Sequence, residues 1–246
     1  RKLIHRIAGK KLYETFGGRL RFFCIGGAKL DSRVERFLKE AKFPYAIGYG
    51  LTETAPLLAG AGTHQTKLQS TGFAVQGVEL KIYEPNKKGV GELWAKGPNV
   101  MKEYYKDPEH TAEVLEDGWF KTGDLVEFDD NDWIYITGRI KNLIILPNGE
   151  NVSPEEIEEL FYKQSLVKDC LVQEMEMNGN TVIGVEIIPY MPELDGASEE
   201  EIQNRLQETV NEVNKELPPF KRVLKLKVRT EDFKRNGAMK ILRNQA

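Results

Sequence analysis

The sequence predicts a mixed chain in two parts, an α/β part that becomes β-rich and an α+β part that follows it. Three observations carry this prediction. Apolar strand-like runs alternate with an amphipathic helix over residues 19–50. Short strands separated by turn signals dominate from about residue 71. After residue 138, helices and alternating strands are mixed. Such patterns separate the layer architectures of globular domains.

Residues 1–70 are predicted to form a parallel sheet fragment. The runs RLRFFCIGG and KFPYAIGYG predict two strands, and DSRVERFLKEAK between them predicts a helix that Asp31 or Ser32 can cap. A strand, a helix and a strand in this order favour parallel pairing. The apolar face of the helix is predicted to consist of Val34, Phe37, Leu38 and Ala41.

Residues 71–138 are predicted to form a small β-barrel or a distorted sheet. GVELKIYE and ELWAKG indicate two strands around the turn PNKKGVG. DPEHTAEVL predicts a short helix, and DLVEFDDNDWIYITG predicts a hairpin that turns at residues 129–132.

Residues 139–246 are predicted to form a separate α+β domain, with the boundary at Gly138–Lys141. Ser153 and Glu156 suit a capping box, with Pro154 at the first helical position. CLVQEMEMNGNTVIGVEIIP predicts a hairpin with Asn-Gly at its turn, and VLKLKVRT a half-buried strand. The long helix between them is predicted to bury a stripe of Ile202, Leu206, Val210, Val213 and Leu217.

Composition excludes several classes of function. A net charge of -3 gives no general attraction to nucleic acid, and no run reaches the roughly 20 apolar residues of a membrane helix. Cys24 and Cys170 match no metal or redox spacing and are expected to be buried thiols, which favours a cytoplasmic location. The scattered histidines do not suggest a metal site. Because the chain begins with Arg1, we expect it to be part of a longer protein.

The motif GYGLTETAP supplies groups that suit a nucleotide. Gly48 and Gly50 let the backbone approach a ligand closely. Tyr49 offers a flat face for a purine, Thr52 a hydroxyl for a phosphate, and Glu53 a hard oxygen for Mg²⁺. The alternative is a polar turn in which Tyr49 is a core aromatic, and the motif alone favours that alternative.

Three further motifs carry polar groups with the same ambiguity. In GWFKTGDL, Asp124 is predicted in a tight turn, where it could accept both ribose hydroxyls or bond its own backbone. In GRIKN, Arg139 can hold ribose or phosphate oxygens, or the segment is a solvated basic turn. In RNGAMKILR, Lys240 can neutralise charge on reacting groups, or it is a solvated lysine.

Together and in this order, the four motifs resemble those of the adenylate-forming enzymes, and most closely the long-chain fatty acyl-CoA synthetases. The resemblance implies ATP, Mg²⁺ and coenzyme A as cofactor and co-substrates, a fatty acid as substrate, and peripheral membrane association through that acid. It implies a partial large AMP-binding domain over residues 1–138 (α/β to about 70, β-rich from 71) and a complete mobile domain over 139–246.

The resemblance also implies a role for each matching residue. Nucleotide-binding roles fall on Gly26, Gly27, Ala28, Tyr49, Gly50, Thr52, Asp124 and Arg139. Thr52 and Glu53 are implied in catalysis, Glu53 also as the magnesium ligand, and Lys240 as the catalytic lysine of adenylation. Lys141 is implied as the hinge of the mobile domain, and Gly149 as a lining of the path of the thiol.

The chain departs from the family pattern in three places. Lys29 stands where a proline is usual, and NGAMK lacks the usual threonines before Lys240. The Ser/Thr/Gly-rich phosphate loop ending in Pro-Lys-Gly has no match. We therefore expect the C-terminal part of a synthetase whose N-terminal part is missing, inactive by itself. A truncated nucleotide- or acyl-CoA-binding module, and a ligase for an aryl or amino acid, remain the alternatives.

Overall fold

A computed structural model describes residues 2–147, 149–237 and 240–243. The chain divides into two compact units, Arg1–Thr137 and Gly138–Ala246, and each is described by itself. Across the described residues, no helix is both long enough and apolar enough to cross a membrane.

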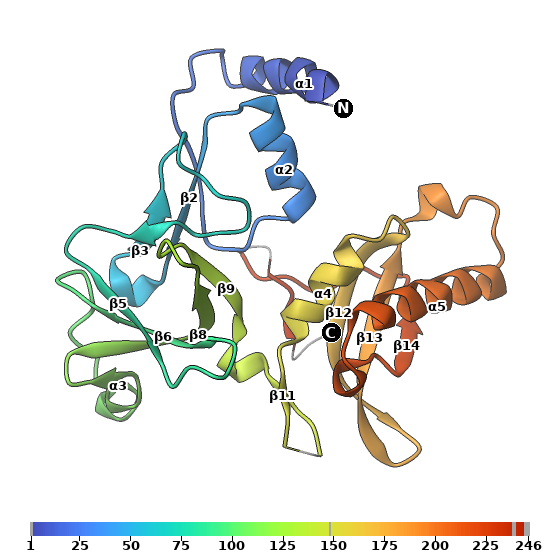
Figure 1. The fold of residues 1–246 in the computed structure, drawn as a ribbon. Coiled ribbons are helices and arrows are strands. Elements are labelled where there is room, and N and C mark those ends of the chain that lie inside the picture. The colour runs from blue at the N-terminus through green and yellow to red at the C-terminus, as the bar shows by residue number, and fades with distance from the viewer. Residues whose placement is uncertain (1, 148, 238–239, 244–246) are drawn as a thin grey trace. The chain divides into compact units, whose positions relative to one another are not determined.

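The first unit combines a helix-backed sheet with an antiparallel sheet (Figure 1). Its helices are α1 (Lys2–Thr15), α2 (Ser32–Ala41), the 3₁₀ turn η1 (Thr52–Thr54) and α3 (Pro108–Val114). Its strands are β1 (Phe23–Ile25), β2 (Tyr45–Gly50), β3 (Leu57–Ala61), β4 (Phe73–Ala74), β5 (Glu79–Tyr83), β6 (Gly91–Lys96), β7 (Leu115–Glu116), β8 (Trp119–Phe128) and β9 (Ile134–Arg139).

The first sheet has the order β1-β2-β3-β4, and its β1–β2 pair is parallel, as predicted. Helix α2 joins these two strands and packs against α1. The Asp31 carboxylate caps α2 by accepting hydrogen bonds from the backbone N–H groups of Arg33 (2.8 Å) and Val34 (3.0 Å). Leu38 is buried as predicted, whereas Val34 is 46% exposed, so its assignment to the buried face was wrong.

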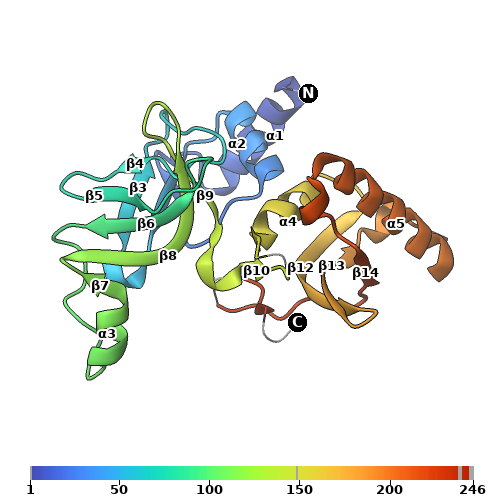
Figure 2. The same cartoon turned by 60° about the horizontal axis from the view of Figure 1, so that its bottom comes forward.

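The second sheet has the order β5-β6-β8-β7, with β9 paired to β8 (Figure 2). The predicted turn between β5 and β6 and the predicted β8–β9 hairpin are both present. One apolar cluster packs residues of β2 and β3 against residues of β6, β8 and β9: Tyr49, Leu58, Ala59, Leu93, Ala95, Val126 and Ile134. This shared core fixes the end of β2 against β8.

The second unit is a three-stranded sheet with helices on one face (Figure 1). Its helices are η2 (Ile140–Asn142), α4 (Pro154–Tyr162), η3 (Met191–Glu193), α5 (Glu199–Glu216) and η4 (Pro219–Lys221). Its strands are β10 (Ile144–Ile145), β11 (Asn151–Val152), β12 (Val167–Met177), β13 (Asn180–Pro189) and β14 (Lys225–Val228).

Strands β12 and β13 form the predicted antiparallel hairpin, and β14 adds parallel to β13. The turn residues Asn178 and Gly179 both have positive φ (53° and 75°), which explains the Asn-Gly sequence. Helices α4 and α5 bury their apolar residues against the sheet, and the predicted stripe of α5 is confirmed. Its members Leu206, Val210 and Val213 are buried, and Ile202 and Leu217 pack beside them.

Two further local predictions were wrong. Ser153 stands at the N-cap of α4 but makes no capping bond, because its hydroxyl donates to Glu155 Oε2 (2.9 Å) and Glu156 pairs with Lys221. Cys24 is exposed rather than buried. It lies on the edge strand β1, where Phe23 and Ile25 face the core and the residue between them faces the other way.

Candidate functional site

Two glycine-containing strand ends meet at one edge of the first sheet. Gly26 and Gly27 follow β1, and Tyr49 and Gly50 end β2. Because β1 and β2 are parallel, their carboxyl ends lie together, which is the edge where open α/β sheets bind ligands. A Cβ at Gly26 would lie only 3.0 Å from the Gly48 carbonyl oxygen, so this loop packs directly on β2.

The loop from Gly26 onward is exposed and turns sharply. Gly27 has φ of 83°, a conformation that suits glycine, and Ala28 follows it on the surface. Lys29, which replaces the usual proline, donates from Nζ to the Ile136 carbonyl of β9 (3.4 Å). The departure at residue 29 thus connects the loop to the second sheet.

The chain folds back closely after β2. A Cβ at Gly50 would overlap the carbonyl oxygen of Pro56, so only glycine fits there. Thr54 is buried and holds the turn, because its hydroxyl accepts from Leu51 N (3.0 Å) and donates to Pro56 O (2.6 Å). Thr52, at the start of η1, keeps an exposed side chain.

Tyr49 and Asp124 come from separate motifs and lie in direct contact. The Tyr49 hydroxyl donates to Asp124 Oδ2 at 2.7 Å. Both residues are nearly buried, with exposed fractions of 8% and 4%. The ring of Tyr49 belongs to the apolar cluster between the two sheets, so it is a core aromatic that also holds the carboxylate of the second motif.

Asp124 lies within β8 and not in the tight turn that the sequence suggested. The β6–β8 pairing shifts register between Glu92 and Trp94, which produces a bulge at this point. Thr122 stabilises the bulge: its hydroxyl donates to the Leu93 carbonyl (2.8 Å) and accepts from Asp124 N (3.1 Å). Such a bulge redirects a side chain, here that of Asp124.

Glu53 is oriented by a residue that the sequence did not indicate. The Tyr104 hydroxyl donates to Glu53 Oε1 at 2.8 Å. Burial and the adjacent carboxylate raise the pKa of Tyr104 to about 12, so the phenol stays protonated as a donor at neutral pH. Glu53 Oε2 accepts no hydrogen bond from the part of the chain that the structure describes.

The first unit therefore gathers most of the predicted site residues, whereas four others belong to the second unit. Arg139 is half-buried at the end of β9, and Lys141 is exposed in η2. Gly149 has φ of 80° and closes the turn between β10 and β11 by donating to the Leu146 carbonyl (2.8 Å). Lys240 is exposed, and its backbone N–H donates to Asn236 Oδ1 (3.0 Å).

Sequence reasoning missed Tyr104, Thr122 and Asn99. Asn99 donates from Nδ2 to the carbonyls of Thr54 and Leu57, both at 2.8 Å, and so supports the chain around η1. Asn99 and Tyr104 lie outside the motifs, whereas Thr122 belongs to GWFKTGDL, in which only Asp124 was singled out. Only the fold, which brings residues 99–104 beside η1 and pairs β8 with β6, reveals their roles.

Fold and site together match one class of protein, the AMP-binding enzymes. The family model described as AMP-binding enzyme matches residues 2–105, and the model described as AMP-binding enzyme C-terminal domain matches residues 141–246. The chain belongs to this family.

Individual relatives show the same relationship. The chain is 37% identical over 176 residues to long chain acyl-CoA synthetase 1 of Arabidopsis thaliana, a match that covers 68% of this chain and 27% of that protein. It is 31% identical to the chloroplastic long-chain-fatty-acid–[acyl-carrier-protein] ligase AEE15 of the same plant, covering 84% of this chain and 31% of the relative.

A solved structure extends the similarity to the fold. O-succinylbenzoate coenzyme A synthetase from Bacillus subtilis, in complex with ATP and magnesium ion, superposes with a TM-score of 0.74 at 27% identity. The superposition covers 96% of this chain and 50% of that one. The chain thus spans about a quarter to a third of the two plant relatives and half of the solved structure.

Proposed function

We propose that this chain is the C-terminal part of an ATP-dependent acid–thiol ligase of the long-chain fatty acyl class. The reaction joins the carboxylate of a fatty acid to AMP with release of pyrophosphate, and then passes the acyl group to the thiol of coenzyme A. The hydrogen bond between Tyr49 and Asp124 is the observation that carries the proposal, since it joins two separate motifs into one site.

In this proposal the Asp124 carboxylate binds the ribose. A carboxylate accepts hydrogen bonds from both hydroxyls of a ribose, as acidic residues do in other nucleotide sites. Tyr49 fixes the carboxylate, and the loop of Gly26, Gly27 and Ala28 leaves room for the adenine at the same sheet edge. Gly50 and Thr52 lie at the end of β2 and would face the phosphates.

The residues around Glu53 fit a magnesium ion that arrives with ATP. Mg²⁺ is usually held by one or two carboxylates together with substrate phosphates and waters. Tyr104 holds one oxygen of Glu53, and no described residue donates to the other. The ion, when bound, would neutralise charge on the phosphates.

The second unit would supply the remaining groups. We assign Arg139 to the ribose or phosphate, Lys141 to the pivot of domain rotation, and Gly149 to the path of the thiol. Lys240 would neutralise charge on the reacting carboxylate and phosphate during adenylation. These assignments rest on the positions of the residues in the family motifs.

The proposal is tested by ATP–pyrophosphate exchange. We expect exchange stimulated by palmitate from the full-length product of the gene, and Asp124→Ala should reduce it at least about 100-fold. The isolated chain of residues 1–246 should show none, because it contains no recognisable phosphate loop. Robust exchange by the isolated chain, or full activity of the Asp124→Ala variant, would contradict the proposal.

The identity of the acid and of the thiol is tested separately. The similarity to an o-succinylbenzoate enzyme supports an aryl acid as the second candidate, and the plant ligase AEE15 supports acyl carrier protein as the acceptor. A panel of palmitate, benzoate and amino acids, each offered with coenzyme A or acyl carrier protein, should show the highest kcat/KM for palmitate with coenzyme A.

A binding module without turnover is a different class of function. It would retain AMP affinity in residues 1–246, and Asp124→Ala would remove that affinity, while the full-length gene product would not turn over. Titration calorimetry with AMP on this chain measures the affinity directly. AMP binding by this chain, together with no ATP–pyrophosphate exchange by the full-length gene product with any acid tested, would favour the binding module over the ligase.

A further inference from the structure

Two short segments, residues 234–236 and 240–242, are bonded to each other, and we call the pair of segments the Lys240 turn. Asn236 N–H donates to the Lys240 carbonyl and Leu242 N–H to the Lys234 carbonyl, both at 2.9 Å. Arg235 and Ile241 form a β-bridge across the turn. The backbone of Lys240 is therefore fixed relative to residues 234–236 and 241–242, and its position depends on what anchors them.

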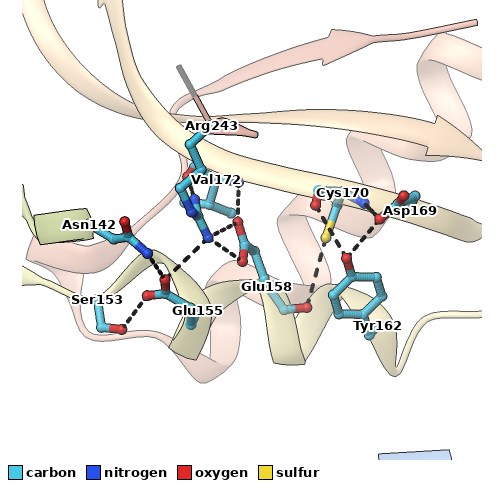
Figure 3. Close-up of polar contacts among 9 residues, drawn as sticks. All are labelled: Asn142, Ser153, Glu155, Glu158, Tyr162, Asp169, Cys170, Val172 and Arg243. Atoms are coloured by element: carbon cyan, nitrogen blue, oxygen red, sulfur yellow. Dashed lines mark hydrogen bonds and ion pairs between the residues drawn. The ribbon is translucent and has the colours of Figure 1, made fainter. Parts of the chain in front are cut away.

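Arg243 anchors the downstream side of the turn to α4 and β12. One terminal nitrogen of its guanidinium lies 2.8 Å and 3.0 Å from the two carboxylate oxygens of Glu158, and the other donates to the Val172 carbonyl at 2.9 Å (Figure 3). Glu158 is 7% exposed and also accepts from Val172 N–H (2.8 Å). Burial raises the pKa of Glu158 to about 7 against the opposing charge of Arg243.

Arg235 anchors the upstream side in the same way. Its guanidinium pairs with Asp169 of β12, a residue that is 9% exposed. Asp169 Oδ1 also accepts from the Tyr162 hydroxyl (2.7 Å) at the end of α4 (Figure 3). The turn that carries Lys240 is thus bracketed by two arginines that both reach nearly buried carboxylates.

A branch of this network reaches the segment after Lys141. The Arg243 guanidinium lies 3.4 Å from Glu155 Oε1, which accepts a 2.6 Å hydrogen bond from the side chain of Asn142 (Figure 3). Asn142 directly follows Lys141. Two hydrogen-bonding steps therefore connect Arg243 with the residue next to the proposed hinge.

We propose that Arg235 and Arg243 are positioning residues that hold Lys240 for adenylation. The proposal rests on the proposed function, because it concerns the same lysine. The position of the Lys240 ammonium follows that of its backbone, and a displacement of about 1 Å can lower a rate on the order of 100-fold.

The placement of the turn is tested without any activity. In hydrogen exchange on residues 1–246, Arg243→Met should speed exchange of the amides of Asn236, Lys240 and Leu242 at least about tenfold. Lys227→Met is the matched control, because Lys227 also pairs with a nearly buried glutamate, Glu186 (2.9 Å). Unchanged exchange in Arg243→Met, or an equal acceleration in the control, would overturn the proposal whether or not the protein is a ligase.

A double variant of the full-length gene product separates positioning from stability. Arg243→Met removes the cation that pairs with the nearly buried Glu158 carboxylate, so the folded state must keep that charge unpaired or take up a proton, and either one destabilises the fold. Adding Glu158→Gln removes that charge and should restore the melting temperature. We expect kcat for ATP–pyrophosphate exchange to stay on the order of 10- to 100-fold low in the double variant, with KM for ATP unchanged.

The second half-reaction completes the test. Thioester formation from supplied acyl-adenylate does not use Lys240 in the proposed mechanism, so the double variant should keep it within about twofold of the parent enzyme. If ATP–pyrophosphate exchange recovers together with the melting temperature, Arg243 has only a structural role and the proposal fails. If the parent enzyme shows no exchange with any acid, the proposed function fails instead, and the hydrogen-exchange result still stands.

Discussion

The hydroxyl of Tyr49 donates a 2.7 Å hydrogen bond to the carboxylate of Asp124 across 75 residues of sequence. This bond connects the end of strand β2 with the bulge of β8, beside an apolar cluster that both sheets share. The orientation of the carboxylate is therefore set by the core of the first unit. Changes in that core are expected to alter ligand affinity and stability together.

Tyr49→Phe should lower the free energy of unfolding of the first unit by about 1.5–3 kcal/mol, because the nearly buried Asp124 carboxylate loses the hydrogen bond from the Tyr49 hydroxyl. Urea unfolding followed by tryptophan fluorescence measures this unit alone, since Trp94, Trp119 and Trp133 all lie within it. Tyr105→Phe is the control: Tyr105 is 86% exposed, and its change should stay within about 0.5 kcal/mol. Equal effects of the two changes would show that the hydrogen bond contributes nothing.

Gly50→Ala should destabilise the first unit by at least about 3 kcal/mol, because the added Cβ would overlap the Pro56 carbonyl. Gly62→Ala is a matched control, since a Cβ there would meet only Gln65 Oε1 at 3.8 Å. Its effect should stay within about 1 kcal/mol. A Gly50→Ala variant with the urea midpoint of the parent would mean that the loop moves aside at little cost.

Tyr104→Phe should raise the Mg²⁺ concentration for half-maximal exchange about tenfold in the full-length gene product, because Glu53 loses the donor that orients it. Exchange rates across a magnesium titration measure the shift. The adjacent Tyr105→Phe should leave the titration unchanged. If Tyr104→Phe shows ATP–pyrophosphate exchange with an unshifted magnesium titration, the assignment of Glu53 to the magnesium site is wrong.

Glu158 predicts how the second unit responds to pH. Burial raises the pKa of Glu158 from 4.5 to about 7 in the folded chain. Between these values the folded state holds a proton that the unfolded chain has released, so the free energy of unfolding falls as pH rises through this window. The contribution is on the order of 3 kcal/mol, present below pH 4.5 and lost above pH 7.

Glu158→Gln isolates that contribution, because glutamine does not titrate. We expect the difference in stability between Glu158→Gln and the parent chain to grow from pH 4.5 to pH 8 in favour of the variant. Hydrogen exchange of the amides in α4 and β12 measures the stability of this unit, which contains no tryptophan. A difference that is constant with pH would show that Arg243 holds the Glu158 pKa at an ordinary value.

Local patterns in the sequence predicted much of the fold. The Asn-Gly turn of β12–β13 and the Asp31 cap of α2 arise from the chemistry of neighbouring residues, and both are present. Periodicity likewise predicted the buried stripe of α5. These features need no information from distant parts of the chain.

The failures have a common cause in long-range packing. Whether Val34 or Cys24 is buried depends on which elements cover that face, and their own segments do not specify this. The Ser153 hydroxyl donates to Glu155, and the Glu156 side chain pairs with Lys221, which lies 65 residues later in the sequence. The motifs indicated Tyr49 and Asp124 as separate candidates. Their contact could not be predicted, because it depends on the core that the two sheets share. The nucleotide-binding and catalytic roles stay predictions.

The exposed edge strand β1 gives the first unit a chemically addressable position. Cys24 is accessible, while burial raises the pKa of the Cys170 thiol well above its ordinary value and keeps it unreactive. A maleimide dye should therefore label residue 24 alone in the native chain, without any substitution. Because Cys24 lies two residues before Gly26, the first residue of the loop, the fluorescence of the dye should change when a nucleotide binds at the sheet edge.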